Sequence, residues 1–101
     1  MSNPVVDTIL AQLGGNKFFV MTGATPLSHT DRALEFKING RHPQHGMINR
    51  LRVELAGDDT YTVTVYRFRK LDYRQIDRKP GVFVESLRST IETLTGLFVS
   101  L

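Results

Sequence analysis

Residues 47–70 read MINRLRVELAGDDTYTVTVYRFRK, and this stretch has the pattern of a β-hairpin. In its first half leucine and valine alternate with charged side chains, which is the two-residue period of a strand buried on one face. The segment Ala56-Gly57-Asp58-Asp59 has the composition of a turn. From Thr60 to Lys70, β-branched and aromatic residues predict a second strand. We therefore expect two adjacent antiparallel strands, with Leu51, Val53 and Leu55 toward the core.

The segments before this hairpin predict one helix and two strands. Asn3 is a candidate N-cap, Pro4 suits the first helical position, and Gly14-Gly15 is typical of a helix end. The predicted elements are a helix over Asn3–Leu13, a strand over Lys17–Thr22, a turn-rich connection over Gly23–Asp31, a strand over Ala33–Ile38, and an exposed loop over residues 39–46.

The segments after the hairpin predict a second helix. Leu71–Lys79 is polar, with extended structure expected around Tyr73–Ile76, and Pro80 is placed at the start of the helix. An apolar stripe at helical spacing follows, made of Val84, Leu87, Ile91 and Leu94. Gly96 is expected to cap the helix, and the apolar end Leu97–Leu101 to pack back on the body.

The order helix, four strands, helix predicts an α+β fold. Strands joined by short turns favour a mainly antiparallel sheet, and helices at both ends of the chain favour packing on one face. We expect a two-layer sandwich that forms a single domain over residues 1–101.

Composition limits the function only broadly. A net charge of +3 is a mild basic excess, compatible with nucleic-acid binding without requiring it. The chain has no cysteine, which excludes disulfides, thiolate metal sites and cysteine nucleophiles. Neither a signal peptide nor a run of about 18 apolar residues is found. We expect a soluble protein of the cytoplasm.

Basic and aromatic residues interleave at the end of the hairpin, and they are the main candidates for binding. Arginine forks match phosphate oxygens, and exposed aromatic rings stack on bases. The candidate nucleic-acid-binding residues are Arg50, Arg52, Arg67, Arg69, Lys70 and Arg74, with Tyr66 and Phe68 for stacking. Strand alternation leaves two alternatives open. Either Tyr66 and Phe68 face the core, or Val63 and Val65 do, and in the first case the surface is only a charged, solvated edge.

Other polar clusters have simpler explanations. His42 and His45 are three residues apart, but a closed metal site needs three or four ligands, and solvated loop histidines are the alternative. Asp58 and Asp59 have turn composition, so we expect them to supply turn hydrogen bonds instead of acid–base chemistry. We find no phosphate-loop, nucleophile-elbow or metalloprotease motif, and we predict neither an enzyme nor a cofactor.

Three segments resemble a family of small, functionally uncharacterised proteins encoded by bacteriophages, prophages and other mobile elements. The similarity lies in residues 9–18 (ILAQLGGNKF) with 21–24 (MTGA), 59–63 (DTYTV) and 95–101 (TGLFVSL). The resemblance implies an accessory protein acting inside a bacterial cell, and it supplies no catalytic or binding residues.

Two functions remain open at this stage. The first is a nucleic-acid-associated accessory domain that binds DNA or RNA weakly through the basic hairpin. The second is a protein-interaction module, either a homo-oligomer or an inhibitor of a host protein, using exposed strands and arginines to meet an acidic partner. No membrane association is expected.

Overall fold

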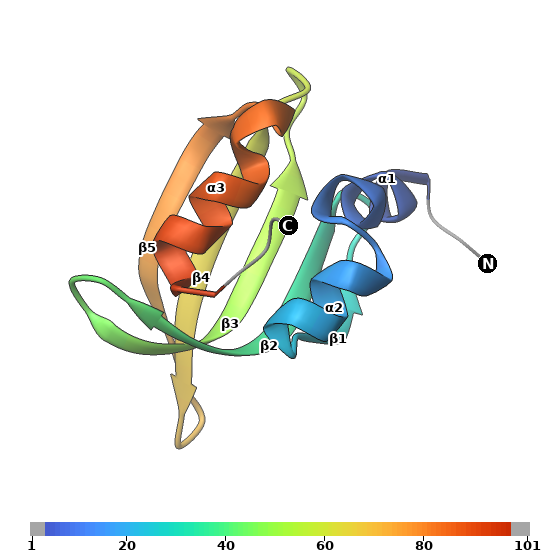
Figure 1. Ribbon diagram of the computed structural model, residues 1–101. Helices are drawn as coiled ribbons and strands as arrows, with labels where there is room; N and C mark the ends of the chain where they lie inside the picture. Colours follow the sequence, from blue (N-terminus) through green and yellow to red (C-terminus); the bar gives the residue numbers. More distant parts are fainter. Residues whose placement is uncertain (1–3, 98–101) are drawn as a thin grey trace.

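The computed structural model describes residues 4–97, which form three helices and five strands (Figure 1). In chain order they are α1 (Pro4–Leu13), α2 (Asn16–Thr22), β1 (Thr25–His29), β2 (Ala33–His42), β3 (Gly46–Leu55), β4 (Tyr61–Arg69), β5 (Asp72–Val82) and α3 (Val84–Thr95).

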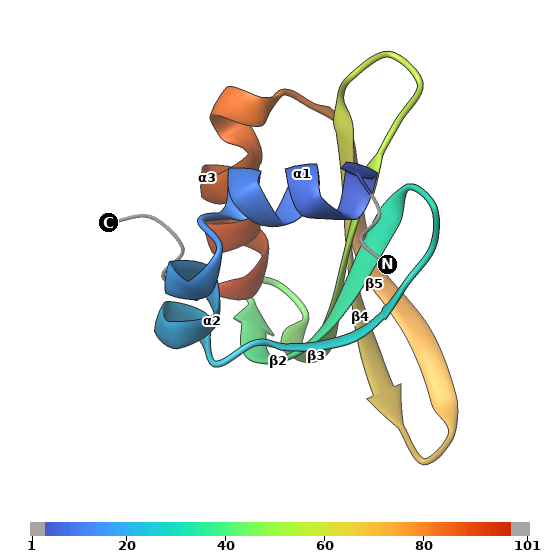
Figure 2. The same cartoon turned by 90° about the vertical axis from the view of Figure 1, so that its right-hand side faces the viewer.

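The strands form one antiparallel meander in the order β1-β2-β3-β4-β5. All three helices lie against the same face of this sheet, as Figure 2 shows, and we call the opposite side the open face. The core between the two layers contains Ile9, Leu13, Phe18, Phe36, Leu51, Val63, Leu87 and Ile91. The α+β class with helices at both ends is confirmed, but the sheet has five strands and not the four that the sequence predicts.

The prediction is wrong for the segment after α1. Lys17–Thr22 belongs to α2, and β1 lies inside the expected connection Gly23–Asp31. Phe18 and Thr22, four residues apart, form a buried helical face. The Phe18 ring meets the Phe36 ring of β2 edge-on at a centroid distance of 5.2 Å. This packing outweighs the strand preference of the aromatic and valine residues.

Strand β2 takes up the first half of the predicted loop at residues 39–46, and β3 begins at its last residue. It passes Ile38 and continues to His42 before the chain turns back into β3. Gly40 makes this path possible, because a Cβ at this position would lie 2.8 Å from the backbone oxygen of Thr95 at the end of α3. Asn39-Gly40 is therefore not a turn. Gly40 lies inside a strand, where it closely approaches the end of α3.

Strand β5 replaces both the polar connection and the predicted start of the last helix. Leu71–Lys79, expected to be extended only around Tyr73–Ile76, forms most of it. Pro80 and Gly81 lie at a bulge in this strand and not in a helix, and the φ of Gly81 is 67°. The missing N–H of Pro80 is tolerated because β5 is an edge strand. Helix α3 begins only at Val84.

Helix α3 buries most of the predicted stripe, namely Leu87, Ile91 and Leu94. Val84 is the exception, since it remains 38% exposed at the first position of the helix. Gly96 ends the helix with a left-handed φ of 68°, as expected. Leu97 packs against the core, and the rest of the predicted apolar end lies outside the described residues.

Helix α1 agrees with its sequence pattern. It begins with Pro4 and buries Val6, Ile9 and Leu13, while its predicted cap Asn3 lies outside the described residues. Within residues 4–97, none of the helices has the length and apolar character needed to cross a bilayer.

Candidate functional site

The orientation of β4 determines where the predicted site residues point. Val63 and Val65 are fully buried on the helix side of the sheet. Because side chains alternate along a strand, Tyr66 and Phe68 lie on the open face and Arg67 shares the face of the two valines. The alternative in which the two aromatic residues belong to the main core is therefore wrong.

The eight predicted residues consequently form two sets instead of one surface. Residues directly opposite each other in paired strands point to the same face. By this rule Arg50, Arg52, Tyr66 and Phe68 lie on the open face, Arg67, Arg69 and Arg74 lie on the helix side, and Lys70 is in the turn between β4 and β5. Within the first set, Arg52 is 4.0 Å from the Glu54 carboxylate.

Asn49 marks the point where β3 and β4 separate. The last paired residues are Arg50 and Tyr66, after which the side chain of Asn49 takes the place of a peptide group. Its amide nitrogen donates to the Phe68 carbonyl at 2.8 Å, and its oxygen accepts the Phe68 N–H at 2.8 Å. Beyond this point the β4–β5 hairpin continues alone. We call residues 66–75 the arm, and both ribbon views show that it projects past the rest of the sheet (Figures 1 and 2).

Arg67 fixes the base of the arm. Its Nε donates to the Met47 carbonyl at 2.8 Å, and one terminal nitrogen donates to the His45 carbonyl at 2.6 Å. Both acceptors belong to the β2–β3 hairpin, which crosses β4 and β5 on the side of α3 (Figure 1). Arg67 therefore joins the two hairpins, and its other terminal nitrogen makes no hydrogen bond within residues 4–97.

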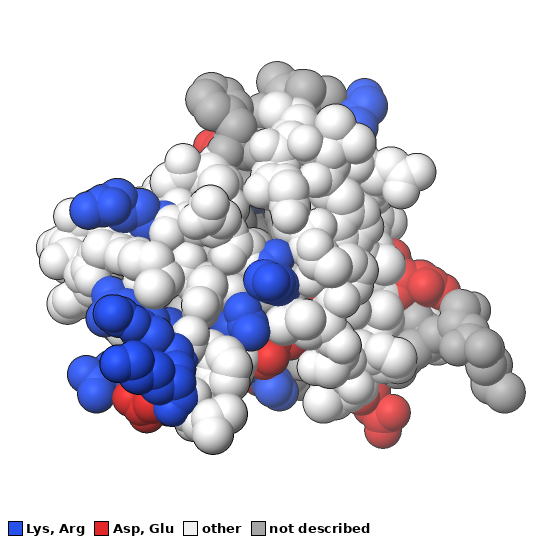
Figure 3. All heavy atoms as spheres, turned by 90° about the horizontal axis from the view of Figure 1, so that it is seen from below, with Lys and Arg blue, Asp and Glu red and all other residues white. Residues whose placement is uncertain are grey.

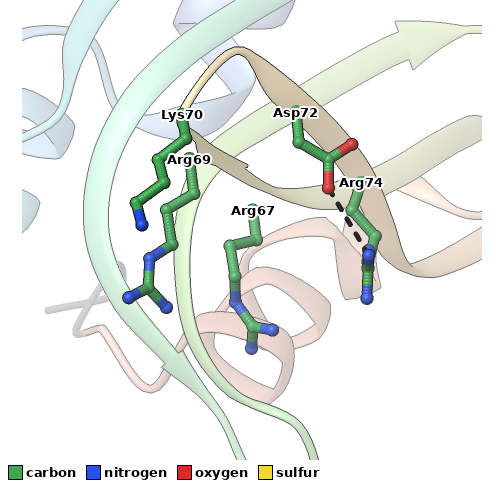
Figure 4. A pocket seen from close by; sticks show the side chains of 5 residues that line it. All are labelled: Arg67, Arg69, Lys70, Asp72 and Arg74. Carbon is green, nitrogen blue, oxygen red and sulfur yellow. Dashed lines mark hydrogen bonds and ion pairs between the residues drawn. The ribbon is translucent and has the colours of Figure 1, made fainter.

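A cavity of about 330 Å³ lies on this side of the arm. It is lined by Arg67, Arg69, Lys70, Asp72 and Arg74, and we call it the basic cavity. In Figure 4 the charged ends of the three arginines and the lysine lie on one side of the hairpin ribbon. Four cations and one carboxylate give the lining a net charge of +3. Such a concentration of like charge attracts an anion.

The cations of the basic cavity are weakly neutralised by the protein itself. Arg74 is 3.4 Å from Asp72, and both side chains are about two-thirds exposed, so this ion pair is weak. Arg69 and Lys70 make no side-chain hydrogen bond or ion pair within residues 4–97. The view from below the arm shows a dense group of Lys and Arg side chains with acidic atoms at its rim (Figure 3). Two cations are therefore available without breaking an internal bond.

The turn at the tip of the arm has an unusual backbone. Lys70 and Leu71 have φ values of 52° and 66°, so both central residues are left-handed. A two-residue turn of this kind matches the twist of the strands but normally contains Asn-Gly. A left-handed residue other than glycine costs about 1–2 kcal/mol. Leu71 is also 91% exposed.

The open face of the arm carries an aromatic cluster. The ring of Tyr73 lies 4.9 Å from that of Tyr66 and 5.4 Å from that of Phe68 between centroids. The Arg50 guanidinium covers Phe68 at 5.1 Å. The Tyr73 hydroxyl donates to Glu35 of β2 at 2.6 Å, and burial together with this bond raises the pKa of Tyr73. The rings pack mainly on each other, and only Tyr73 is substantially exposed, at 44%.

His42 has a structural role in the β2–β3 hairpin. Its Nδ1 accepts the N–H groups of Gln44 and His45, so the proton is assigned to Nε2, which donates to Asp77 of β5 at 2.9 Å. This hydrogen bond is the main reason why the pKa of Asp77 is lowered. Both ring nitrogens of His42 are thus engaged. Within residues 4–97 no group of three or more metal-ligating side chains comes together.

Asp58 supplies turn hydrogen bonds, in agreement with its sequence context. Its carboxylate accepts the N–H of Thr60 at 3.2 Å and the hydroxyl of Thr60 at 2.6 Å, and these bonds lower its pKa. Asp59 completes the turn with a left-handed φ of 65°. The acidic pair therefore shapes the β3–β4 connection.

Sequence reasoning misses three residues at the site: Asn49, Leu71 and Glu35. No local signal distinguishes Asn49, because its partner is a backbone group 19 residues away. The pattern around Glu35 indicates only the outward face of a strand. Leu71 does carry a signal, since it is an apolar residue in a charged run at the junction of two strands.

Comparison of the chain with protein-family models, with curated proteins and with solved structures gave no match. The function is therefore inferred from the chemistry of the site.

Proposed function

We propose that this chain is a small, non-enzymatic accessory protein of a mobile element that binds nucleic acid through its arm. The observation that carries the proposal is the basic cavity, where Arg67, Arg69, Lys70 and Arg74 surround one space at a projecting hairpin tip. Arginine forks bind phosphate with two parallel hydrogen bonds, and phosphate repeats along every nucleic acid.

The affinity expected from this surface is modest and depends on salt. Arg69 and Lys70 are available, Arg74 is held only by a weak ion pair, and Arg67 offers one terminal nitrogen. Two to four phosphate contacts correspond to a slope of log affinity against log salt of about −2 to −4 on duplex DNA. Contacts to phosphates carry no sequence information, and these cations are proposed to contact phosphates. We therefore expect little sequence preference.

Fluorescence anisotropy with labelled single-stranded and duplex oligonucleotides, over a series of salt concentrations, tests the proposal. Lys70→Gln should weaken binding and reduce the slope by about 0.9. Lys17→Gln is the matched control, because it removes the same charge from an exposed position on α2. Absence of binding at low salt, or equal effects of the two variants, would rule out the arm as the binding surface.

A second candidate function is suggested by a groove between β5 and α3. It has a volume of about 300 Å³ and is lined by Lys79, Pro80, Val82, Ser89, Thr90, Thr93 and Leu94. The next residue in the chain after β5, Phe83, is 64% exposed, which is high for a large apolar side chain. This combination suits a protein partner or a second copy of the chain. Size exclusion with light scattering tests for self-association, and capture from host lysate tests for a partner. Both experiments would compare the wild type with Phe83→Ser. They support this function only if a defined complex of the wild type is lost in the variant.

A further inference from the structure

The fold explains the turn at the tip of the arm, but it does not explain why a leucine occupies it. Leu71 is left-handed, with a φ of 66°, although glycine or asparagine suits this turn better. Its side chain is also 91% exposed and does not belong to the hydrophobic core. A single exposed leucine is ordinary, but backbone strain that brings no packing in return indicates a function.

The position of Leu71 relative to the basic cavity gives that function a chemistry. Lys70 precedes it and Asp72 follows it, and both line the cavity together with Arg69 and Arg74. An apolar tip is thus placed beside cations that suit phosphates. Proteins that kink duplex DNA use this combination, with an apolar side chain inserted between base pairs and basic side chains on the adjacent backbone.

We propose that Leu71 is a wedge that enters a base step of double-stranded DNA while the basic cavity holds the flanking phosphates. This inference rests on the proposed nucleic-acid binding. The arm is the narrow end of a two-stranded ribbon that projects from the body, so it reaches a groove without contact from the helices (Figure 2). Pyrimidine–purine steps such as TA are the expected sites, because they unstack most easily.

A partner protein or a bilayer is less favoured, because one leucine gives a small apolar contact while most of the surface around it is charged.

Energy transfer between dyes at the two ends of a short duplex measures the bend. With a central TA step, the wild-type protein should increase the transfer at saturation. A duplex with only G on one strand and only C on the other contains no pyrimidine–purine step and should respond less. Leu71→Gly should abolish the increase and weaken binding by less than tenfold, since the phosphate contacts remain. Leu71→Met, which keeps an apolar side chain, should preserve the bend.

The Leu71→Gly variant also controls for folding. Glycine adopts a positive φ without strain, so its thermal midpoint should be equal to or higher than that of the wild type. Loss of the bend in a protein that is at least as stable would therefore be an effect of the missing side chain.

The outcomes separate this inference from the proposed function. If the wild type binds no oligonucleotide, both fail. If it binds with a salt-dependent affinity but leaves the duplex straight, or if Leu71→Gly bends it equally well, the wedge is refuted and the phosphate contacts stand. Tighter binding to anionic lipid vesicles than to duplex, lost in Leu71→Gly, would assign the residue to a membrane and overturn the inference.

Discussion

Replacing Gly40 by alanine tests how the β2–β3 hairpin is seated on α3. A Cβ at position 40 would lie 2.8 Å from the Thr95 carbonyl oxygen, 3.3 Å from the Thr95 Cβ and 3.4 Å from Ile48 Cγ1. The nearest atom belongs to the backbone at the end of a helix, so it cannot move aside as a flexible side chain would. The added methyl group must therefore displace β2 or α3.

Two opposing effects set the size of the change. Alanine in a strand interior is favoured over glycine by about 0.5–1 kcal/mol, because the unfolded chain loses less freedom on folding. Overpacking a tight contact costs about 1–3 kcal/mol. The net result is a loss of about 1 kcal/mol in the free energy of unfolding. For a domain of this size that corresponds to a fall in Tm of about 4–8 °C.

Urea and thermal denaturation followed by circular dichroism would measure this loss. Gly57→Ala is the matched control, because a Cβ at position 57 would meet no atom within 4 Å and neither glycine has a left-handed φ. The control should change the free energy of unfolding by less than about 0.5 kcal/mol in either direction. If Gly40→Ala were as stable as the wild type or more stable, the close contact between β2 and α3 would be refuted.

Three further changes test contacts that position the arm. Asn49→Leu leaves the Phe68 N–H and carbonyl without their partner and should lower the free energy of unfolding by about 1–3 kcal/mol in urea denaturation; a change near zero would contradict the bridging role. Asp77 has a pKa below its ordinary value of 3.8 in the folded state, so the stability it supplies is present above that pH and is lost as the pH falls below it. The stability advantage of the wild type over Asp77→Asn should therefore shrink in acid unfolding below about pH 3.8, and a constant difference would argue against the His42 bond as the cause. Tyr73→Phe removes the hydroxyl bond across the open face but keeps the ring, and thermal denaturation should show a loss of about 0.5–1 kcal/mol, with no loss meaning that solvent replaces the bond.

Local sequence patterns are sufficient to predict an element where the side chains to be buried and the turn or cap residues indicate the same structure. Strand β3 follows the alternation of Leu51 and Val53 with charged residues, and β4 follows its β-branched and aromatic composition. The Asp58 turn also follows its composition. The ends of α1 and α3 follow from glycines that adopt left-handed conformations without strain. In each case the residues that determine the structure are neighbours in the chain.

Tertiary contacts decide the remaining elements. Residues Lys17–Thr22 form a helix because Phe18 packs on Phe36, although their composition favours a strand. The path of β2 through Gly40 depends on α3, whose contact residue Thr95 is far along the chain. The polar sequence of β5 is a strand because β4 supplies its hydrogen bonds, while its other edge faces solvent.

The same division applies to the candidate site. The sequence alone identifies the basic and aromatic residues of the hairpin, because charge and ring chemistry do not depend on the fold. It cannot show that they lie on two opposite faces, since the register of β4 depends on which side chains the helices bury. The basic cavity exists because Asn49 ends the pairing of β3 with β4 and Arg67 then holds the two hairpins together through carbonyl groups about 20 residues away. Contacts over such distances in the chain are set by packing of the whole sheet, and only the tertiary structure contains them.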